Sequence, residues 1–83
     1  MKLQDTIEMM NSSDYKERFR AEFLQLKIRR DGLQNMLSKY RNNELAFVPT
    51  CSYELLHKQL IFMDCYMNIL SERAIIENVD LYK

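Results

Sequence analysis

The sequence that decides the fold is residues 51–76, CSYELLHKQLIFMDCYMNILSERAII. Its apolar residues recur at steps of four and three, a spacing that places them on one face of an α-helix. These residues are Leu56, Leu60, Met63, Met67, Leu70 and Ala74. Because the rhythm is unbroken over the whole stretch, it predicts one long helix with a single buried face.

A second long helix is predicted over residues 14–41, with Ser13 or Asp14 as its N-cap and Glu17 in capping-box position after Asp14. Its apolar face follows a similar rhythm and consists of Phe19, Phe23, Leu26, Leu33, Leu37 and Tyr40. Gly32 lies inside this segment at a cost of about 1 kcal/mol relative to alanine. The apolar positions stay in phase on both sides of Gly32, so we expect a continuous helix, with a bend there as the alternative.

The remaining segments are short. Leu3, Ile7 and Met10 have helical spacing, which predicts a short helix or turn over residues 3–10. Pro49 biases the residue before it toward extended geometry, so residues 42–50 are predicted to form a loop whose apolar part folds over the end of the hairpin. The expected fold is a single all-α domain over residues 1–83, an antiparallel hairpin of two long helices preceded by the short N-terminal element.

Composition excludes several classes of protein. With 83 residues there is room for one core, and one glycine and one proline are too few for the turns of an all-β fold. The sequence lacks a run of about 18 apolar residues, so we expect no membrane span. The N-terminal residues carry Asp5 and Glu8 where a signal peptide needs an apolar stretch. We therefore expect a soluble, cytoplasmic protein.

The zero net charge conceals two unequal halves. Residues 1–41 contain nine Lys/Arg against six Asp/Glu, whereas residues 42–83 contain three Lys/Arg against six Asp/Glu. The two halves can neutralise one another when the helices pair. A protein that binds duplex nucleic acid normally keeps an uncompensated basic surface, so we expect no duplex nucleic acid as partner.

Residues with catalytic or metal-binding chemistry are sparse. Cys51 and Cys65 are fourteen residues apart, and His57 is the only histidine, which is too few ligands at the compact spacing of a zinc site. A dyad of Cys51 and His57 would lack a glycine-rich oxyanion turn and an orienting partner. Phosphate-binding loops and zinc-protease motifs are also absent from the sequence. We expect no catalytic activity, no metal and no cofactor.

A row of polar residues runs beside the apolar face of the first long helix: Tyr15, Arg18, Glu22, Gln25 and Arg29. In an antiparallel pair the register places Arg18 opposite Glu77 and Glu22 opposite Arg73. Such flanking charges commonly fix the orientation of paired helices. The alternative is that the row contacts a ligand or a partner protein.

Arg30 lies inside the apolar face, four residues after Leu26. A desolvated guanidinium is costly unless it meets an anion. It can pair with Asp64 of the last helix, or extend past the edge of the apolar face to water. The alternative is that Arg30 binds an anion at a subunit interface.

Further apolar residues lie off the main faces of both helices: Leu24, Ile28, Leu55, Ile61, Phe62 and Ile75. A lone hairpin of this size cannot bury both sets. We therefore expect a homo-oligomer with this second set at the interface.

Three stretches resemble small helical proteins carried by phages and prophages, most of them uncharacterised. They are DYKERFRAEFLQL at residues 14–26, LAFVPTC at residues 45–51, and the last helix with Gln59, Met63, Tyr66, Leu70 and Arg73. The size and layout are also similar to those of the viral sponge proteins, homo-oligomers that sequester cyclic oligonucleotides and so blunt the antiviral signalling known as CBASS.

The resemblance implies a counter-defence protein of the host cytoplasm that sequesters a small anionic nucleotide between its subunits. In the sponges an N-terminal tyrosine stacks on a base and a basic residue of the following helix holds phosphate, places that Tyr15 and Arg30 would fill here. Arg18 and Arg29 would add positive charge. The sponges commonly have lysine where this chain has Arg30, whose guanidinium binds phosphate in a forked geometry. The alternatives are a module that inhibits a host defence or replication protein, and a helical scaffold.

Overall fold

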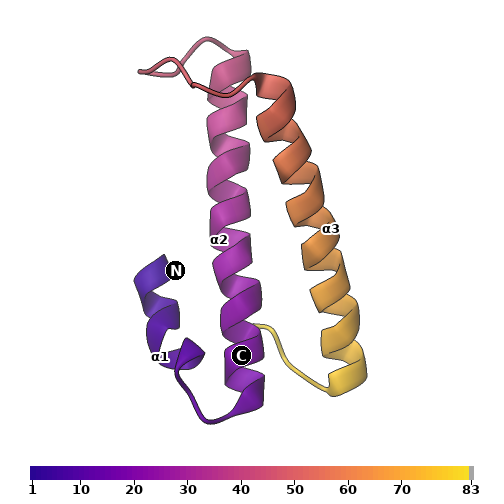
Figure 1. Ribbon diagram of the computed structural model, residues 1–83. Coiled ribbons are helices and arrows are strands. Elements are labelled where there is room, and N and C mark those ends of the chain that lie inside the picture. Colours follow the sequence, from indigo (N-terminus) through magenta and orange to yellow (C-terminus); the bar gives the residue numbers. More distant parts are fainter. Residues whose placement is uncertain (83) are drawn as a thin grey trace.

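The computed structural model describes residues 1–82 and is all-helical over that range, as predicted (Figure 1). A short helix η1 (Leu3–Thr6) continues into α1 (Ile7–Met10), and two long helices follow, α2 (Tyr15–Arg41) and α3 (Tyr53–Glu77). α2 and α3 pack side by side in opposite directions and form an elongated hairpin of 43 × 24 × 18 Å.

Polar side chains set the ends of both long helices. The Asp14 carboxylate accepts a hydrogen bond from the Lys16 backbone N–H at the start of α2, at 2.9 Å. The Ser52 hydroxyl accepts one from the Leu55 N–H at 3.2 Å, and α3 therefore begins at Tyr53 rather than at residue 51. Asn78 adopts a left-handed conformation with φ of 57°, which ends α3 and reverses the chain.

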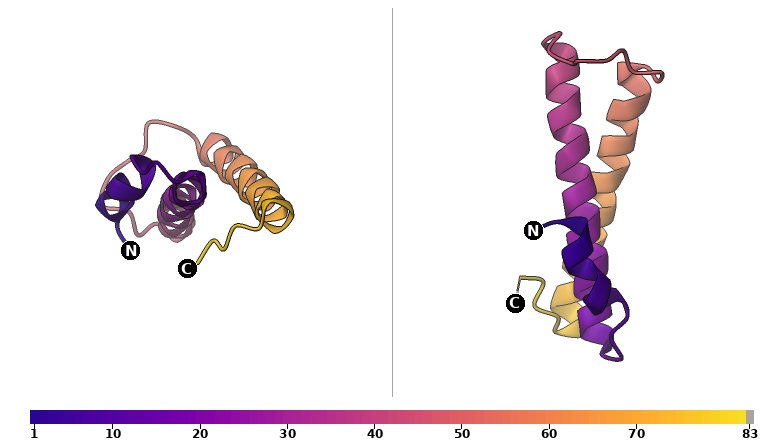
Figure 2. Two further views of the ribbon diagram at one scale, coloured as in Figure 1. Left: turned by 90° about the horizontal axis from the view of Figure 1, so that it is seen from below. Right: turned by 90° about the vertical axis from the view of Figure 1, so that its left-hand side faces the viewer.

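The main core lies at the end of the hairpin that is near both termini. Phe19 and Phe23 of α2 pack against Leu70 and Ala74 of α3. Val79 and Leu81 of the C-terminal tail, residues 78–82, complete this core. After the reversal at Asn78 the tail runs back from α3 toward α2, as Figure 2 shows. The helical spacing in the sequence did not predict that residues beyond α3 would be part of the core.

The N-terminal segment packs along α2 on the side away from α3 (Figures 1 and 2). Ala21 is fully buried, and it lies two residues from Phe19 and from Phe23, which places it on the opposite face of α2. Its small side chain lets η1 and α1 approach the helix closely. Thr6 of η1 is also fully buried, with its hydroxyl bound to the Leu3 carbonyl.

Two expectations about apolar residues hold only in part. Leu24 and Ile28 are half-buried within the chain itself: Leu24 packs against the core, and both line a hollow together with Met1 and Tyr82. The apolar loop covers the end of the hairpin only in part. Leu45 and Pro49 are half-buried and line a hollow with Tyr40 of α2, whereas Val48 is 92% exposed.

Candidate ligand-binding face

One flank of the hairpin carries a row of mostly exposed polar and aromatic side chains, which we call the polar face. It comprises Tyr15, Arg18, Glu22, Gln25 and Arg29 of α2 with Tyr66, Arg73 and Glu77 of α3. The α2 members follow one another at steps of three and four residues, so they share one side of the helix. Hydrogen bonds between side chains join the α2 members to the α3 members.

A three-residue cluster closes the end of the polar face nearest the start of α2. The Tyr15 hydroxyl donates to Glu77 Oε1 at 2.5 Å and accepts from Arg73 Nη2 at 3.0 Å. Arg73 Nε also donates to Glu77 Oε2 at 3.0 Å, and its guanidinium lies 5.0 Å from the centre of the Phe19 ring. Arg73 is thereby held between a carboxylate and an aromatic ring.

The cluster changes the acidity of its members. The bond donated to Glu77 raises the pKa of Tyr15 above its usual value, because ionising the phenol would forfeit that bond beside a negative charge. The pKa of Glu77 is lowered, first by the bond from Tyr15 and then by Arg73. Glu77 is therefore a carboxylate at neutral pH.

The predicted ion pairs across the two helices were wrong. Glu22 accepts a hydrogen bond from the Tyr66 hydroxyl instead of pairing with Arg73. Glu77 accepts from Tyr15 and from Arg73, its neighbour one turn earlier on α3, instead of from Arg18. The long tyrosine side chains span the space between the helices and reach the carboxylates, which leaves Arg73 to pair along its own helix.

As a result, two cations of the polar face have no carboxylate partner among the described residues. Arg18 donates to the Ser12 carbonyl at 2.8 Å and lies 6.0 Å from the centre of the Tyr15 ring. Arg29 is exposed and forms no ion pair or side-chain hydrogen bond within residues 1–82. The Tyr15 ring beside Arg18 is 46% exposed. An aromatic ring and two guanidinium groups without a carboxylate partner in the described part of the chain thus lie along one helix face.

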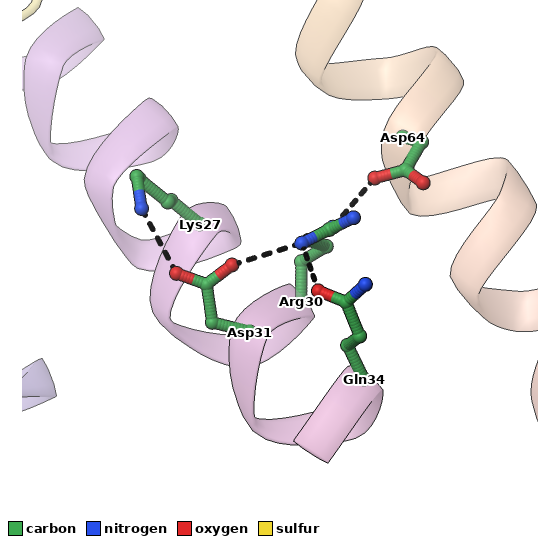
Figure 3. A network of polar contacts seen from close by, with 5 residues as sticks. All are labelled: Lys27, Arg30, Asp31, Gln34 and Asp64. Carbon is green, nitrogen blue, oxygen red and sulfur yellow. Dashed lines mark hydrogen bonds and ion pairs between the residues drawn. The ribbon is translucent and has the colours of Figure 1, made fainter. Parts of the chain in front are cut away.

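By helical spacing, Arg30 lies toward the other flank of the hairpin, the side of α2 that carries Lys27 and Asp31. Figure 3 shows that it is fully engaged with its neighbours and with Asp64. Its Nε donates to Asp64 Oδ1 at 2.6 Å, and its Nη1 contacts Gln34 Oε1 at 2.5 Å and Asp31 Oδ1 at 3.2 Å. Lys27 pairs with Asp31 at 2.9 Å. The interpretation of Arg30 as the ion-pair partner of Asp64 is confirmed.

The charges of this cluster, Lys27, Arg30, Asp31 and Asp64, balance one another. Asp64 and then Asp31 raise the pKa of Arg30, and Lys27 and then Arg30 lower the pKa of Asp31. A hollow of about 380 Å³ lies beside the cluster, lined by its four residues with Met67 and Asn68. Both cations at this hollow already have a carboxylate partner.

The four residues predicted to bind a ligand therefore divide between two flanks. Tyr15, Arg18 and Arg29 belong to the polar face, while Arg30 contacts Asp64 on the other flank. Tyr15 and Arg30 are also fifteen residues apart, about 22 Å along the helix. A single chain does not bring these two residues to one small ligand.

Tyr66 and Arg73 also belong to the polar face, although the sequence gave them no ligand-binding role. Gln59, Tyr66 and Arg73 follow one another at intervals of seven residues, so they lie on one line along α3. This spacing is the signal that could have added Tyr66 and Arg73 to the predicted site.

At the loop end of the hairpin, Tyr53 stacks on His57 at 5.8 Å. Cys51 and Cys65 are exposed and unbonded. Residues 1–82 contain no group of three or more His, Cys, Asp or Glu side chains placed to hold a metal ion.

The family model described as Sequestin matches residues 13–76. This range covers α2, the loop and nearly all of α3, and so includes both the polar face and the Arg30 cluster. The family name indicates a protein that binds and sequesters. No curated protein and no solved structure matches the chain. Within the described residues, each helix is too short or too polar to cross a membrane.

Proposed function

The chain belongs to the Sequestin family, and from that premise we propose that it is a non-catalytic protein that sequesters a small anionic nucleotide between two copies of itself. The layout that it shares with the viral sponge proteins favours a cyclic oligonucleotide signal as the ligand and phage counter-defence, in the host cytoplasm, as the role. Such a protein acts by binding and enclosing its ligand, so it needs no catalytic residues.

The observation that carries this proposal is an arginine without a carboxylate partner in residues 1–82, beside a partly exposed aromatic ring, with a second such arginine on the same helix face. Arg18 lies close to Tyr15, and Arg29 lies about 16 Å further along α2. Guanidinium groups bind phosphate in forked geometry, and an aromatic ring offers a surface on which a base stacks. Tyr15 and Arg18 therefore match the two parts of one nucleotide, and Arg29 would bind a more distant phosphate.

Two copies are proposed because a single hairpin offers little enclosure. Small-molecule sites usually bury most of the ligand surface. Most side chains of the polar face are exposed on one flank of two helices. A second copy beside this flank would supply a further wall and could double the number of cations.

Arg30 enters the proposal differently from the other three residues. To bind phosphate it would have to exchange its bond to Asp64 for one to the ligand, and Asp31 would remain beside it. We therefore assign the phosphate first to Arg18 and Arg29. The role of Arg30 in binding is tested separately.

The test combines native mass spectrometry with isothermal titration calorimetry. The ligands are cyclic di- and trinucleotides and their linear counterparts. The double variant Arg18→Gln/Arg29→Gln is compared with Lys39→Gln/Arg41→Gln, which removes two positive charges from the same helix outside the polar face. We expect a retained nucleotide, and a loss of affinity of at least about 100-fold in the first double variant only, since each charged hydrogen bond contributes about 1.5–3 kcal/mol.

Two results would contradict the proposal: no nucleotide of the panel binds, or the Arg18/Arg29 variant binds as tightly as its control. Arg30→Gln is measured beside them. A loss of affinity in Arg30→Gln without a change in folding would restore Arg30 to the binding site.

One observation favours a second candidate, a module that inhibits a host protein. Phe47 and Val48 at the tip of the hairpin are 56% and 92% exposed, and an exposed apolar tip suits contact with another protein. This candidate is supported if Phe47→Ser/Val48→Ser abolishes inhibition of a purified host defence enzyme while nucleotides have no effect on that enzyme or on the melting temperature of the chain.

A further inference from the structure

We propose that the outer surface of α3 pairs with α3 of a second copy in antiparallel orientation, about a two-fold axis near Cys65. The contact is made by four residues that we call the outer stripe: Leu55, Phe62, Ile69 and Ile76. This inference deepens the proposed function, because it specifies which surfaces of the two copies come together.

The outer stripe has the spacing of a helix–helix interface. Its four members are seven residues apart, so they form a single line along α3. All four are large and apolar, yet they are 57%, 62%, 56% and 82% exposed in the order of the sequence. The α3 residues that do pack against α2, such as Leu60 and Leu70, lie on a different side of the helix and are buried. The hairpin alone therefore leaves this line uncovered along the whole length of α3.

The outer stripe is complementary to itself when it is turned end to end. Residues 65 and 66 stand at the middle of α3. A two-fold axis there places Leu55 opposite Ile76 of the second copy and Phe62 opposite its Ile69. All four positions then meet an apolar partner, and both ends of the stripe are covered.

Charge selects this orientation over the parallel one. Lys58 and Glu72 are exposed residues that flank the outer stripe, at three residues after Leu55 and three after Ile69. The antiparallel arrangement brings Lys58 toward Glu72 of the second copy, twice by symmetry. A parallel arrangement would place the Lys58 and Glu72 side chains of the two copies on opposite sides of the interface, so it would gain no such ion pair.

This pairing also joins the two polar faces. Tyr66 is four residues after Phe62 and three before Ile69, so it stands at the edge of the outer stripe. The same Tyr66 donates its hydrogen bond to Glu22 of the polar face. A two-fold axis near residue 65 therefore brings Tyr66 of each copy toward the other, and the polar faces of the two copies meet along the edge of the interface.

Disulfide cross-linking tests the orientation directly. Both native cysteines are first replaced, as Cys51→Ser/Cys65→Ser, and single or paired cysteines are added in the outer stripe. Leu55 and Ile76 are exposed, so these changes leave the hairpin intact, which circular dichroism verifies. After mild oxidation, we expect the variant carrying both Leu55→Cys and Ile76→Cys to form a covalent dimer, and the variants carrying either change alone to stay uncrosslinked.

Three results would overturn the inference. Cross-linking of Leu55→Cys alone would show a parallel pair, and absence of a covalent dimer in the paired variant would exclude the contact. A monomer in light scattering of the native chain at about 100 μM would exclude the interface altogether. Nucleotide binding is measured on the same samples. Binding without the cross-link overturns this inference alone, and the cross-link without binding overturns only the proposed function.

Discussion

The two flanks of the hairpin carry similar residues but differ in whether their cations are paired with carboxylates. On the flank with Arg30, a lysine and an arginine meet two aspartates, and each cation has a carboxylate partner. On the polar face, tyrosine hydroxyls occupy the carboxylates of Glu22 and Glu77, and Arg18 and Arg29 are left without one. The difference teaches that the number of cations does not identify a phosphate site. What matters is whether the carboxylates nearby are already bound to something else.

The flanks also differ in what covers them. The C-terminal tail runs along the same side of α2 as Arg30, where Lys16 donates to the Asn78 carbonyl at 2.9 Å and Arg20 to the Asp80 carbonyl at 3.3 Å. The tail adds Val79 and Leu81 to the core. Most residues of the polar face remain exposed; Gln25 and Glu77 are half-buried, and Gln25 donates to Met10 of α1. One flank therefore contributes to stability, and the other is open to a ligand or to a second copy.

The largest expected effect concerns the tail. Leu81→Ala should lower the free energy of unfolding by about 2–4 kcal/mol, because Leu81 is 8% exposed and packs in the main core. Ile75→Ala is the matched control, since Ile75 is 80% exposed and should change stability by less than about 0.5 kcal/mol. Urea denaturation measures both. Equal effects of the two changes would mean that the tail is not part of the core.

The second prediction compares substitutions at two neighbouring arginines, Arg30 and Arg29. Arg30→Met should lower the free energy of unfolding by about 1–2 kcal/mol, because it leaves Asp64 without its partner at a partly buried position. Arg29→Met should change stability by less than about 0.5 kcal/mol, since Arg29 has no partner to lose. Urea denaturation compares the two. If Arg29→Met is the more damaging change, the division of the flanks is wrong.

The outcome for these arginines shows what helical spacing can and cannot predict. The apolar steps of four and three fix which faces of α2 and α3 meet, and they placed Arg30 within reach of Asp64. The same spacing could not predict the partners of Glu22 and Glu77. Those depend on how far Tyr15 and Tyr66 extend between the helices, which is a property of side-chain length and rotamer rather than of position on the helix.

The C-terminal tail escaped prediction for a related reason. Val79 and Leu81 lie beyond the last helical repeat, and their alternation is too short to indicate a structure. Their burial depends on the left-handed turn at Asn78, a single backbone state that directs the chain back onto α2. The partial burial of Leu24 and Ile28 escaped prediction for the same reason, because the residues that share their hollow, Met1 and Tyr82, belong to the irregular ends of the chain.

The smallest expected effect concerns the Tyr15 hydroxyl, which donates a hydrogen bond to the Glu77 carboxylate on the polar face. Tyr15→Phe removes the first cause of the lowered pKa of Glu77 and leaves Arg73 as the second, so this pKa should rise toward its ordinary value. In the native chain the folded pKa of Glu77 is lower than the unfolded one. The contacts of Glu77 therefore stabilise the fold above the ordinary glutamate pKa, and that contribution is lost as pH falls through the lowered pKa.

In Tyr15→Phe this acid-dependent loss should be smaller, and it should be complete at a higher pH, because the folded pKa moves toward an unchanged unfolded pKa. NMR titration of the Glu77 side chain measures the pKa, with Tyr66→Phe as the control because it removes a hydroxyl from the same face without touching Glu77. An unchanged Glu77 pKa in Tyr15→Phe would mean that Arg73 alone holds the carboxylate. In that case Tyr15 would be free to serve a ligand through both its ring and its hydroxyl.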